Sequence, residues 1–452
     1  MYLNAPPHHC PERKRMALWF EQALLPEGWR KGVRITLAGN RIATLTSDTN
    51  PQPQDERHGP AFPGLPNVHS HAFQRAMAGL TERAGNTADS FWTWREAMYR
   101  FVDRLNPEGL HAIAALAYAE MLEGGFTRVG EFHYLHHDPN GAPYANPAAM
   151  AQAIAQAARD SGIGLTLLPV FYAHADFGGA PPTHGQRRFL HDRDSFARLL
   201  EALKPLDVPL GIAPHSLRAV TPEELAAILP LAPDGPIHIH IAEQMAEVDA
   251  CLGWSGQRPV EWLMDHAPVD RRWCLVHATH ITESERNRIA QSGATVGLCP
   301  ITEANLGDGL FPAQPFLAAG GRIGIGSDSN VEIDVAAELR LLEYGQRLSR
   351  QGRNLLASAP GQSTGASLYN AARQGAHALG ASPATLAPGA RADIVTLRRD
   401  PPAHALLDGW IFARARIDSV WCDGRKRVSA GVHHGRPAIE ARYNQLLKAL
   451  LD

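Results

Sequence analysis

The chain has 452 residues, of which 44% are hydrophobic and 20% are charged, and its formal net charge is -3. This composition is ordinary for a soluble globular protein with one large and one smaller domain. The small net charge gives no broad electrostatic reason to bind nucleic acid or an acidic membrane, and no apolar run is long enough to span a bilayer. We therefore expect neither a nucleic-acid nor a membrane partner.

The five cysteines are scattered along the chain: Cys10, Cys251, Cys274, Cys299 and Cys422. Their spacing offers neither a zinc ribbon nor a redox pair, and it argues against a disulfide framework. We therefore expect a cytoplasmic protein. Residues 1–15 lack the apolar core of a signal peptide, and we expect a disordered extension there.

The two ends of the chain have similar sequence patterns. Short strand-like segments separated by Gly, Pro and Asn turn signals fill residues 16–60, and similar segments recur within residues 388–437. We predict that these two stretches form one small, discontinuous β-sandwich domain. An amphipathic helix is expected over residues 438–452.

Residues 61–387 alternate short apolar strands with longer helical stretches. The expected strands are 63–69, 127–132, 164–172, 209–213, 237–241, 274–277, 295–298 and 323–326. The expected helices are 107–124, 147–161, 194–202, 222–229 and 283–293. Apolar strands with helix-length spacers favour a parallel sheet, and eight such units predict an α/β fold of the (β/α)8 TIM-barrel type. The absence of a glycine-rich dinucleotide turn or phosphate loop weakens the alternative of an open sheet.

The first expected strand ends in the motif His69-Ser70-His71. Side chains of a strand alternate between its two faces, so His69 and His71 point the same way. Two imidazoles on one face form half of a transition-metal site. For this motif alone, a pair of buried histidines held by hydrogen bonds is an open alternative.

Further polar residues stand at the ends of later expected strands, where barrels of this type carry their active groups. His240 and Glu243 close the fifth strand, with His238 one layer deeper, and His277 ends the sixth strand. Asp328 follows the eighth strand, where a carboxylate is costly unless it is paired or binds a cation. Singly, His277 or Asp328 could cap a helix, but their order along the chain indicates one metal site.

This order of groups resembles the amidohydrolase superfamily. The resemblance implies that His69, His71, His240 and Asp328 hold one divalent metal per subunit, with Zn2+ the expected ion. Members with two metals carry a lysine at the end of the fourth strand. Residues 211–216 contain no lysine, so a mononuclear site is implied.

The resemblance also implies the roles of the catalytic residues. Zinc with an open coordination position lowers the pKa of its bound water to about 7, which supplies hydroxide at neutral pH. Asp328 would take the proton of that water and His277 would orient the hydroxide. Glu243 would protonate the nitrogen that leaves as ammonia. A glutamate at this position is the pattern of the deaminating members.

Six segments narrow the resemblance to the formimidoylglutamate deiminase family: 67–77, 91–95, 131–138, 215–220, 238–244 and 302–309. That family hydrolyses N-formimidoyl-L-glutamate to N-formyl-L-glutamate and ammonia in histidine degradation, and a homodimer is implied. The resemblance assigns substrate binding to Gln74, Arg95, Tyr134, His215 and Arg218. The two arginines would meet the substrate carboxylates, because a guanidinium group pairs bidentately with a carboxylate. Gln74, Tyr134 and His215 would line the formimidoyl side.

Two other functions stay open from the sequence. A guanine-type or adenosine-type aminohydrolase would keep the barrel and the metal, whereas a non-catalytic scaffold would be expected to have lost metal ligands. His133, His136 and His137 are expected to be hydrogen-bonded loop or core histidines, because the metal already has four ligands. Trp92 and Trp94 fit either a pocket wall or the core.

Overall fold

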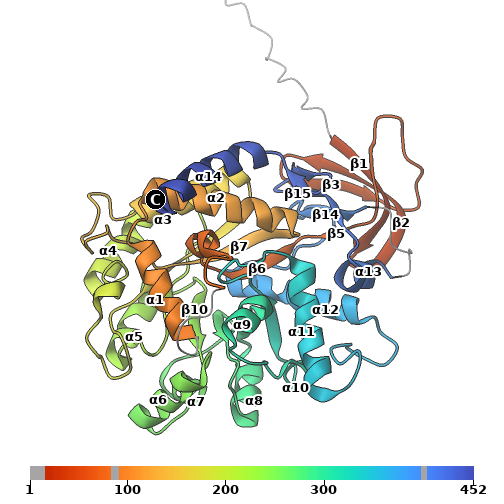
Figure 1. Ribbon diagram of the computed structural model, residues 1–452. Helices are drawn as coiled ribbons and strands as arrows, with labels where there is room; N and C mark the ends of the chain where they lie inside the picture. The colour runs from red at the N-terminus through yellow and green to blue at the C-terminus, as the bar shows by residue number, and fades with distance from the viewer. Residues whose placement is uncertain (1–15, 83–90, 399–404, 452) are drawn as a thin grey trace, which may run out of the picture.

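The computed structural model describes residues 16–82, 91–398 and 405–451 (Figure 1). The extension predicted over residues 1–15 lies outside the described residues. Within these ranges, every helix is too short or too polar to cross a membrane.

Eight parallel strands form the barrel. They are β6 (Leu65–Ser70), β7 (Phe126–His133), β8 (Gly164–Phe171), β9 (Ala213–Pro214), β10 (Ile237–Ile241), β11 (Trp273–His277), β12 (Thr295–Leu298) and β13 (Arg322–Ile325). Their order in the sheet is β10-β11-β12-β13-β6-β7-β8-β9. Parallel bridges from Ile212 to Ile237 and from Ser216 to His240 bring the two edges together. The predicted (β/α)8 barrel is therefore confirmed.

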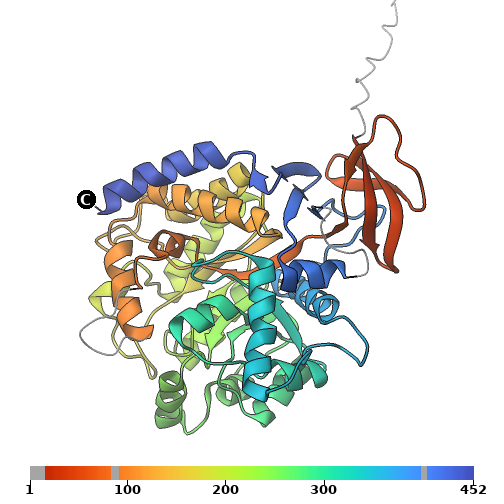
Figure 2. The same ribbon diagram turned by 45° about the vertical axis from the view of Figure 1, so that its right-hand side comes forward.

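Helices cover the outside of the barrel (Figure 2). They are α1 (Phe91–Val102), α2 (Pro107–Glu123), α3 (Ala149–Ser161), α4 (Arg193–Leu203), α5 (Pro222–Ile228), α6 (Met245–Ser255), α7 (Pro259–His266), α8 (Glu283–Ser292), α9 (Pro300–Leu306), α10 (Ala313–Ala318), α11 (Val335–Arg350) and α12 (Thr364–Arg373). Side-chain caps explain where several of these helices begin. Thr221 and Thr282 accept hydrogen bonds from the backbone three residues later, at the first turns of α5 and α8.

Strands from both ends of the chain form a second sheet. They are β1 (Met16–Leu25), β2 (Gly28–Ala38), β3 (Arg41–Thr46), β4 (Glu56–His58), β5 (Ala61–Pro63), β14 (Ile394–Leu397), β15 (Ile417–Cys422), β16 (Arg425–Ser429) and β17 (Val432–His433). The predicted β-sandwich is hydrogen-bonded as one continuous mixed sheet, because β5 pairs with β1 on one side and β14 on the other. Residues 61–63, which the sequence analysis assigned to the barrel, thus lie in the small sheet. The barrel begins at Leu65, because Gly64 separates β5 from β6.

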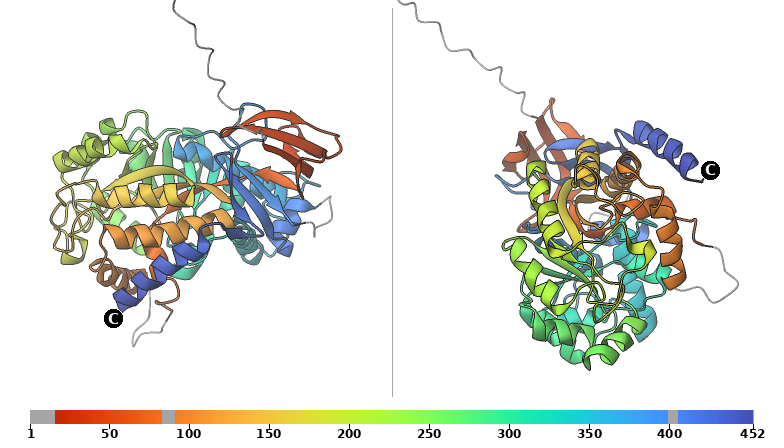
Figure 3. Two further views of the ribbon diagram at one scale, coloured as in Figure 1. Left: turned by 90° about the horizontal axis from the view of Figure 1, so that it is seen from above. Right: turned by 90° about the vertical axis from the view of Figure 1, so that its left-hand side faces the viewer.

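Two helices belong to the C-terminal part of the chain. Helix α13 (Leu406–Ala413) lies between β14 and β15 in sequence and is not predicted by the pattern. Helix α14 (Arg436–Leu451) closes the chain, as predicted, and runs alongside α2 (Figure 3). Arg436 joins the two helices through ion pairs to Glu120 and Glu123 at 3.2 and 2.8 Å.

Candidate metal centre and active site

The backbone turns abruptly where the strands reach the barrel mouth. After β10 and at the ends of β11 and β13, four non-glycine residues have positive φ: Ala242 (51°), His277 (67°), Ala278 (46°) and Asp328 (43°). Such left-handed conformations are uncommon for these residue types and gather at functional sites. These turns end three barrel strands at the same edge, and they set the directions of His277 and Asp328.

Four side chains meet at this edge. His69 Nε2 lies 3.2 Å from His71 Nε2 and 3.0 Å from His240 Nε2. Asp328 Oδ1 lies 3.4 Å from His69 Nε2 and 3.3 Å from His71 Nε2. All four side chains are buried, and their ligand atoms lie within 4.8 Å of one another. The structure therefore brings together the four residues that the sequence predicts as ligands.

Hydrogen bonds fix two of these imidazole rings. His71 Nδ1 donates to the carbonyl of Phe132 at 2.9 Å, and His240 Nδ1 donates to the carbonyl of His215 at 3.0 Å. Because a carbonyl only accepts, each Nε2 keeps its lone pair for the centre of the cluster. Burial also lowers the pKa of both imidazoles, so that they are neutral.

The charge of the cluster suits a divalent cation. Burial alone would raise the pKa of Asp328, but contacts with His69 and His71 hold that pKa below its usual value. A carboxylate and three neutral nitrogen atoms aimed at one point repel one another unless a cation lies between them. Three nitrogen ligands and one oxygen ligand match the set that zinc prefers in proteins.

His277 and Glu243 stand beside this cluster. His277 Nε2 lies 3.8 Å from Asp328 Oδ2 and 3.7 Å from Glu243 Oε1. Burial raises the pKa of Glu243 to about 7, which suits a group that gives and takes protons near neutral pH. Burial alone would lower the pKa of His277, but Glu243 and Glu303 raise it well above its usual value.

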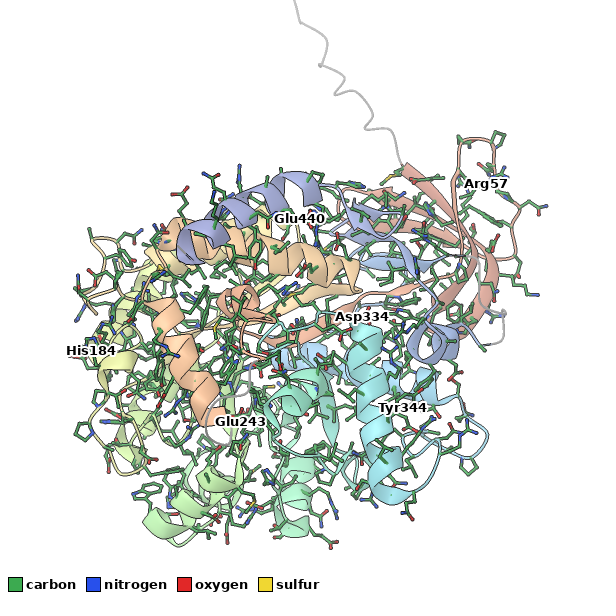
Figure 4. The ribbon with its side chains drawn as sticks, in the orientation of Figure 1. Arg57, His184, Glu243, Asp334, Tyr344 and Glu440 are labelled. Carbon is green, nitrogen blue, oxygen red and sulfur yellow. The ribbon has the colours of Figure 1, made fainter. Side chains whose placement is uncertain are left out.

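A cavity opens above these residues. Glu243 stands at the barrel mouth near α1 (Figure 4), and Trp94 from that helix lines the same cavity. All five predicted substrate-binding residues also line it: Gln74, Arg95, Tyr134, His215 and Arg218. Gln74 Nε2 donates to the Tyr134 hydroxyl at 2.9 Å, which holds two polar groups of the wall in place.

Two cations face this cavity. Burial alone would lower the pKa of Arg218, but Glu247 and Glu243 raise it, so the guanidinium group stays charged. Arg95, on α1, lies with Cζ 5.7 Å from the centre of the Tyr99 ring. A cavity with two guanidinium groups suits a ligand with two carboxylates better than a neutral purine.

Several histidines outside the cluster behave as structural residues. His136 Nε2 donates to the Val170 carbonyl at 3.0 Å and His137 Nε2 donates to the Leu190 carbonyl at 2.7 Å, as expected. His238 Nε2 donates to the Ala378 carbonyl at 2.6 Å, below the site. His133 is buried, but its Nε2 has no hydrogen-bond partner among the described residues. The side chain of Trp92 lies outside the described part of the chain.

Two buried acids near the site were not singled out from the sequence. Glu303 Oε1 lies 3.2 Å from His277 Nδ1, and it also accepts a hydrogen bond from the Cys299 backbone at 2.9 Å. Asp308 accepts a hydrogen bond from Gln244, and burial raises its pKa to about 9. Both residues lie in segment 302–309. The signal for Glu303 is a carboxylate in the first turn of α9, directly after a strand end, whereas Asp308 follows the end of that helix and has no such signal.

Comparisons with known proteins place the chain in a family. The model of the "Amidohydrolase family" matches residues 61–427, and that of the "Formimidoylglutamate deiminase HutF, N-terminal domain" matches residues 16–59. A formimidoylglutamate deiminase of Pseudomonas aeruginosa is 50% identical over 451 residues, with coverage of 96% of this chain and 100% of that protein. An 8-oxoguanine deaminase of the same organism is 31% identical over 418 residues, with coverage of 86% and 87%.

A solved structure gives the same result for the fold. The crystal structure of an amidohydrolase from Brucella melitensis superimposes with a TM-score of 0.93 at 52% identity, covering 97% of this chain and 100% of that one. The barrel, the converging ligand atoms and these comparisons lead to one conclusion. The chain belongs to the amidohydrolase family and carries the N-terminal domain of its formimidoylglutamate deiminases.

Proposed function

We propose that the protein hydrolyses N-formimidoyl-L-glutamate to N-formyl-L-glutamate and ammonia, a step of histidine degradation. The observation that carries the proposal is one cavity, whose lining combines three residues of the ligand cluster with Glu243 and with the guanidinium groups of Arg95 and Arg218. The substrate has two carboxylates and one amidine, which are the groups that such a cavity accommodates. The relative of 50% identity that carries this name supports the same substrate.

We assign His69, His71, His240 and Asp328 as the ligands of one divalent metal per subunit, and we propose Zn2+ as that metal. The convergence of their ligand atoms and the neutral state of the imidazoles support this assignment. When bound, zinc supplies a Lewis acid that lowers the pKa of water to about 7.

The remaining catalytic steps belong to side chains of the cavity. Asp328 Oδ2 faces His277, so Asp328 is positioned to accept the proton of the attacking water and His277 is positioned to orient that water. Glu243 lies on the other side of His277 Nε2, and its pKa of about 7 lets it deliver a proton to the leaving nitrogen. Protonation makes the leaving group ammonia rather than amide ion.

The cavity wall determines how the substrate would lie. We propose that Arg95 and Arg218 hold the two carboxylates, because they are the two guanidinium groups of the cavity lining. The amidine would then lie against Gln74, Tyr134 and His215, close to the cluster. Gln74 and Tyr134 are already joined by a hydrogen bond, so little ordering is needed on binding.

Ammonia release by the purified, zinc-loaded protein tests this proposal. The panel consists of formimidoylglutamate, formimidoylaspartate, guanine and adenosine. Release from formimidoylglutamate at the highest kcat/KM is expected. Preferential release from guanine would point instead to the purine branch represented by the 8-oxoguanine deaminase relative. No release from any compound would favour a non-catalytic scaffold.

We further propose a cytoplasmic homodimer with no nucleic-acid or membrane partner. The scattered cysteines and the net charge of -3 support the cytoplasmic location and the lack of nucleic-acid and membrane partners, and the family resemblance supports the dimer. We also propose a division into a small β domain, a barrel domain and the closing helix, with β5 counted in the small domain. Sedimentation velocity measures the oligomeric state directly, and a mass of one chain would contradict the dimer.

A further inference from the structure

A thiol lies directly beside the candidate metal centre. Cys299 follows β12 and is completely buried. Its sulfur atom, one ligand atom of His277 and one oxygen of Asp328 all lie within 4.8 Å of one another. Of the four cysteines in the described residues, Cys299 is the one whose sulfur lies in a group of potential metal ligands.

The carboxylate of Asp328 faces two directions. Its Oδ1 lies 3.4 and 3.3 Å from His69 and His71, within the first cluster. Its Oδ2 lies 3.8 Å from His277 Nε2, away from those two imidazoles. Carboxylates commonly bridge two cations through their two oxygens. Asp328 can therefore serve a second ion while it stays a ligand of the first.

Glu303 contacts both of the other two proposed ligands, His277 and Cys299. Its Oε1 accepts from His277 Nδ1 at 3.2 Å and from the Cys299 backbone at 2.9 Å. Because Glu303 accepts from Nδ1, that nitrogen keeps its proton, and His277 Nε2 is the atom that can give up its proton and bind a metal. Gly326, at the end of β13, makes the approach of the thiol feasible, because a Cβ there would lie 2.9 Å from Cys299 Sγ.

We propose that a second, soft divalent cation binds between His277, Cys299 and Asp328 and inhibits the enzyme. One sulfur, one nitrogen and one oxygen ligand select Zn2+ or Cd2+ over Mg2+ or Ca2+. Binding forms bonds from the Cys299 sulfur and from His277 Nε2 to the cation, and it releases to solvent the thiol proton and the Nε2 proton of the His277 imidazole. Inhibition follows because the ion takes up the lone pair of His277 Nε2 and the free oxygen of Asp328. The inhibition rests on the proposed function, whereas the binding of the second cation does not.

Cadmium binding to the full-length protein tests the site without an activity assay. Protein that already holds one equivalent of Zn2+ is dialysed against Cd2+, and the total metal content and the ultraviolet cadmium–thiolate absorption are measured. One additional equivalent with a thiolate band is expected. Binding of no additional equivalent would overturn the proposal.

Matched cysteine variants identify the thiol. C299S is expected to lose the band and the second equivalent but to keep the first zinc. C274S is the control within the barrel, because Cys274 is equally buried but stands outside the cluster. C10S removes the thiol of the His8-His9-Cys10 segment, which is a competing source of the band. A band that persists in C299S, or that disappears in C10S or C274S, would overturn the assignment.

Two further measurements separate the possible failures. If C299S does not retain the first zinc, C299A replaces it, and the C10S/C274S double variant shows whether the band survives in a chain with native Cys299. For inhibition, ammonia release is expected to need about tenfold more Cd2+ in C299S than in C274S. If no variant releases ammonia, the proposed function fails, but the metal stoichiometry still decides the cation site.

Discussion

Glu303 Oε1 lies 3.2 Å from His277 Nδ1, deep in the barrel mouth, and both side chains are buried. The carboxylate fixes the orientation of the imidazole and directs Nε2 toward Asp328 and Glu243. A buried acid behind an active-site imidazole is a frequent means of fixing its tautomer. Glu303 is thus a positioning residue that acts through His277.

The variant E303A is expected to lower kcat by about 10- to 100-fold with little change in KM, because the substrate cavity is intact but His277 is no longer oriented. E303Q should recover part of the loss, since its amide oxygen still accepts from Nδ1. Steady-state kinetics of ammonia release and the zinc content measure both effects. E283Q is the control, because Glu283 also stands in the first turn of a helix but is exposed. A rise in KM with unchanged kcat would contradict the positioning role.

The variant R218M is expected to lower kcat/KM for formimidoylglutamate by about 100-fold or more, equivalent to about 3 kcal/mol. The loss should exceed that of a surface ion pair, because Arg218 is buried and its partner carboxylate would be desolvated in the cavity. R353M, at an exposed position, is the matched control. An unchanged kcat/KM in R218M would contradict the proposal that a substrate carboxylate binds at this wall of the cavity.

Stability should fall on mild acidification because of His191, whose ring centre lies 4.7 Å from that of His136. Burial lowers the pKa of His191 from 6.5 to about 3, so the unfolded state binds more protons between these values. The free energy of unfolding therefore decreases as pH falls through this window, by up to about 1.4 kcal/mol per pH unit for this residue.

Denaturant unfolding at pH 7.0, 6.0 and 5.0 measures this slope. H191N should be less stable at pH 7.0 but should show a shallower pH dependence than the native chain. H184N is the control, because His184 is exposed, and its slope should equal that of the native chain. Equal slopes in H191N and the native chain would show that His191 is not the residue that takes up a proton on unfolding.

Removal of the metal should lower the melting temperature as well as the activity. Without a cation, the convergent nitrogen atoms of His69, His71 and His240 lose the charge that stabilises their contact. Dialysis against a chelator followed by calorimetry measures the change, and Zn2+ should restore both properties. D328N should bind zinc more weakly and melt near the metal-free temperature. An unchanged melting temperature after verified removal would contradict a structural contribution from the metal.

Much of the fold was determined by local sequence pattern. Strands β10 and β12 have the bounds that the sequence predicts. Their mostly apolar residues are all buried, as expected for strands of a parallel sheet that is covered on both faces. The motif His69-Ser70-His71 and the residues His240, His277 and Asp328 also follow from strand alternation and strand ends. These properties are local, so the sequence alone determined them.

Only the tertiary structure decided the relationships between distant segments. Strand pairing breaks at Gly64, and residues 61–63 belong to the small sheet because their hydrogen-bond partners are supplied by β1 and β14. The pairing of Glu303 with His277 and the approach of Cys299 to Asp328 depend on how β11, β12 and β13 stand side by side. Periodicity in one segment carries no information about such neighbours, since packing across the barrel sets them.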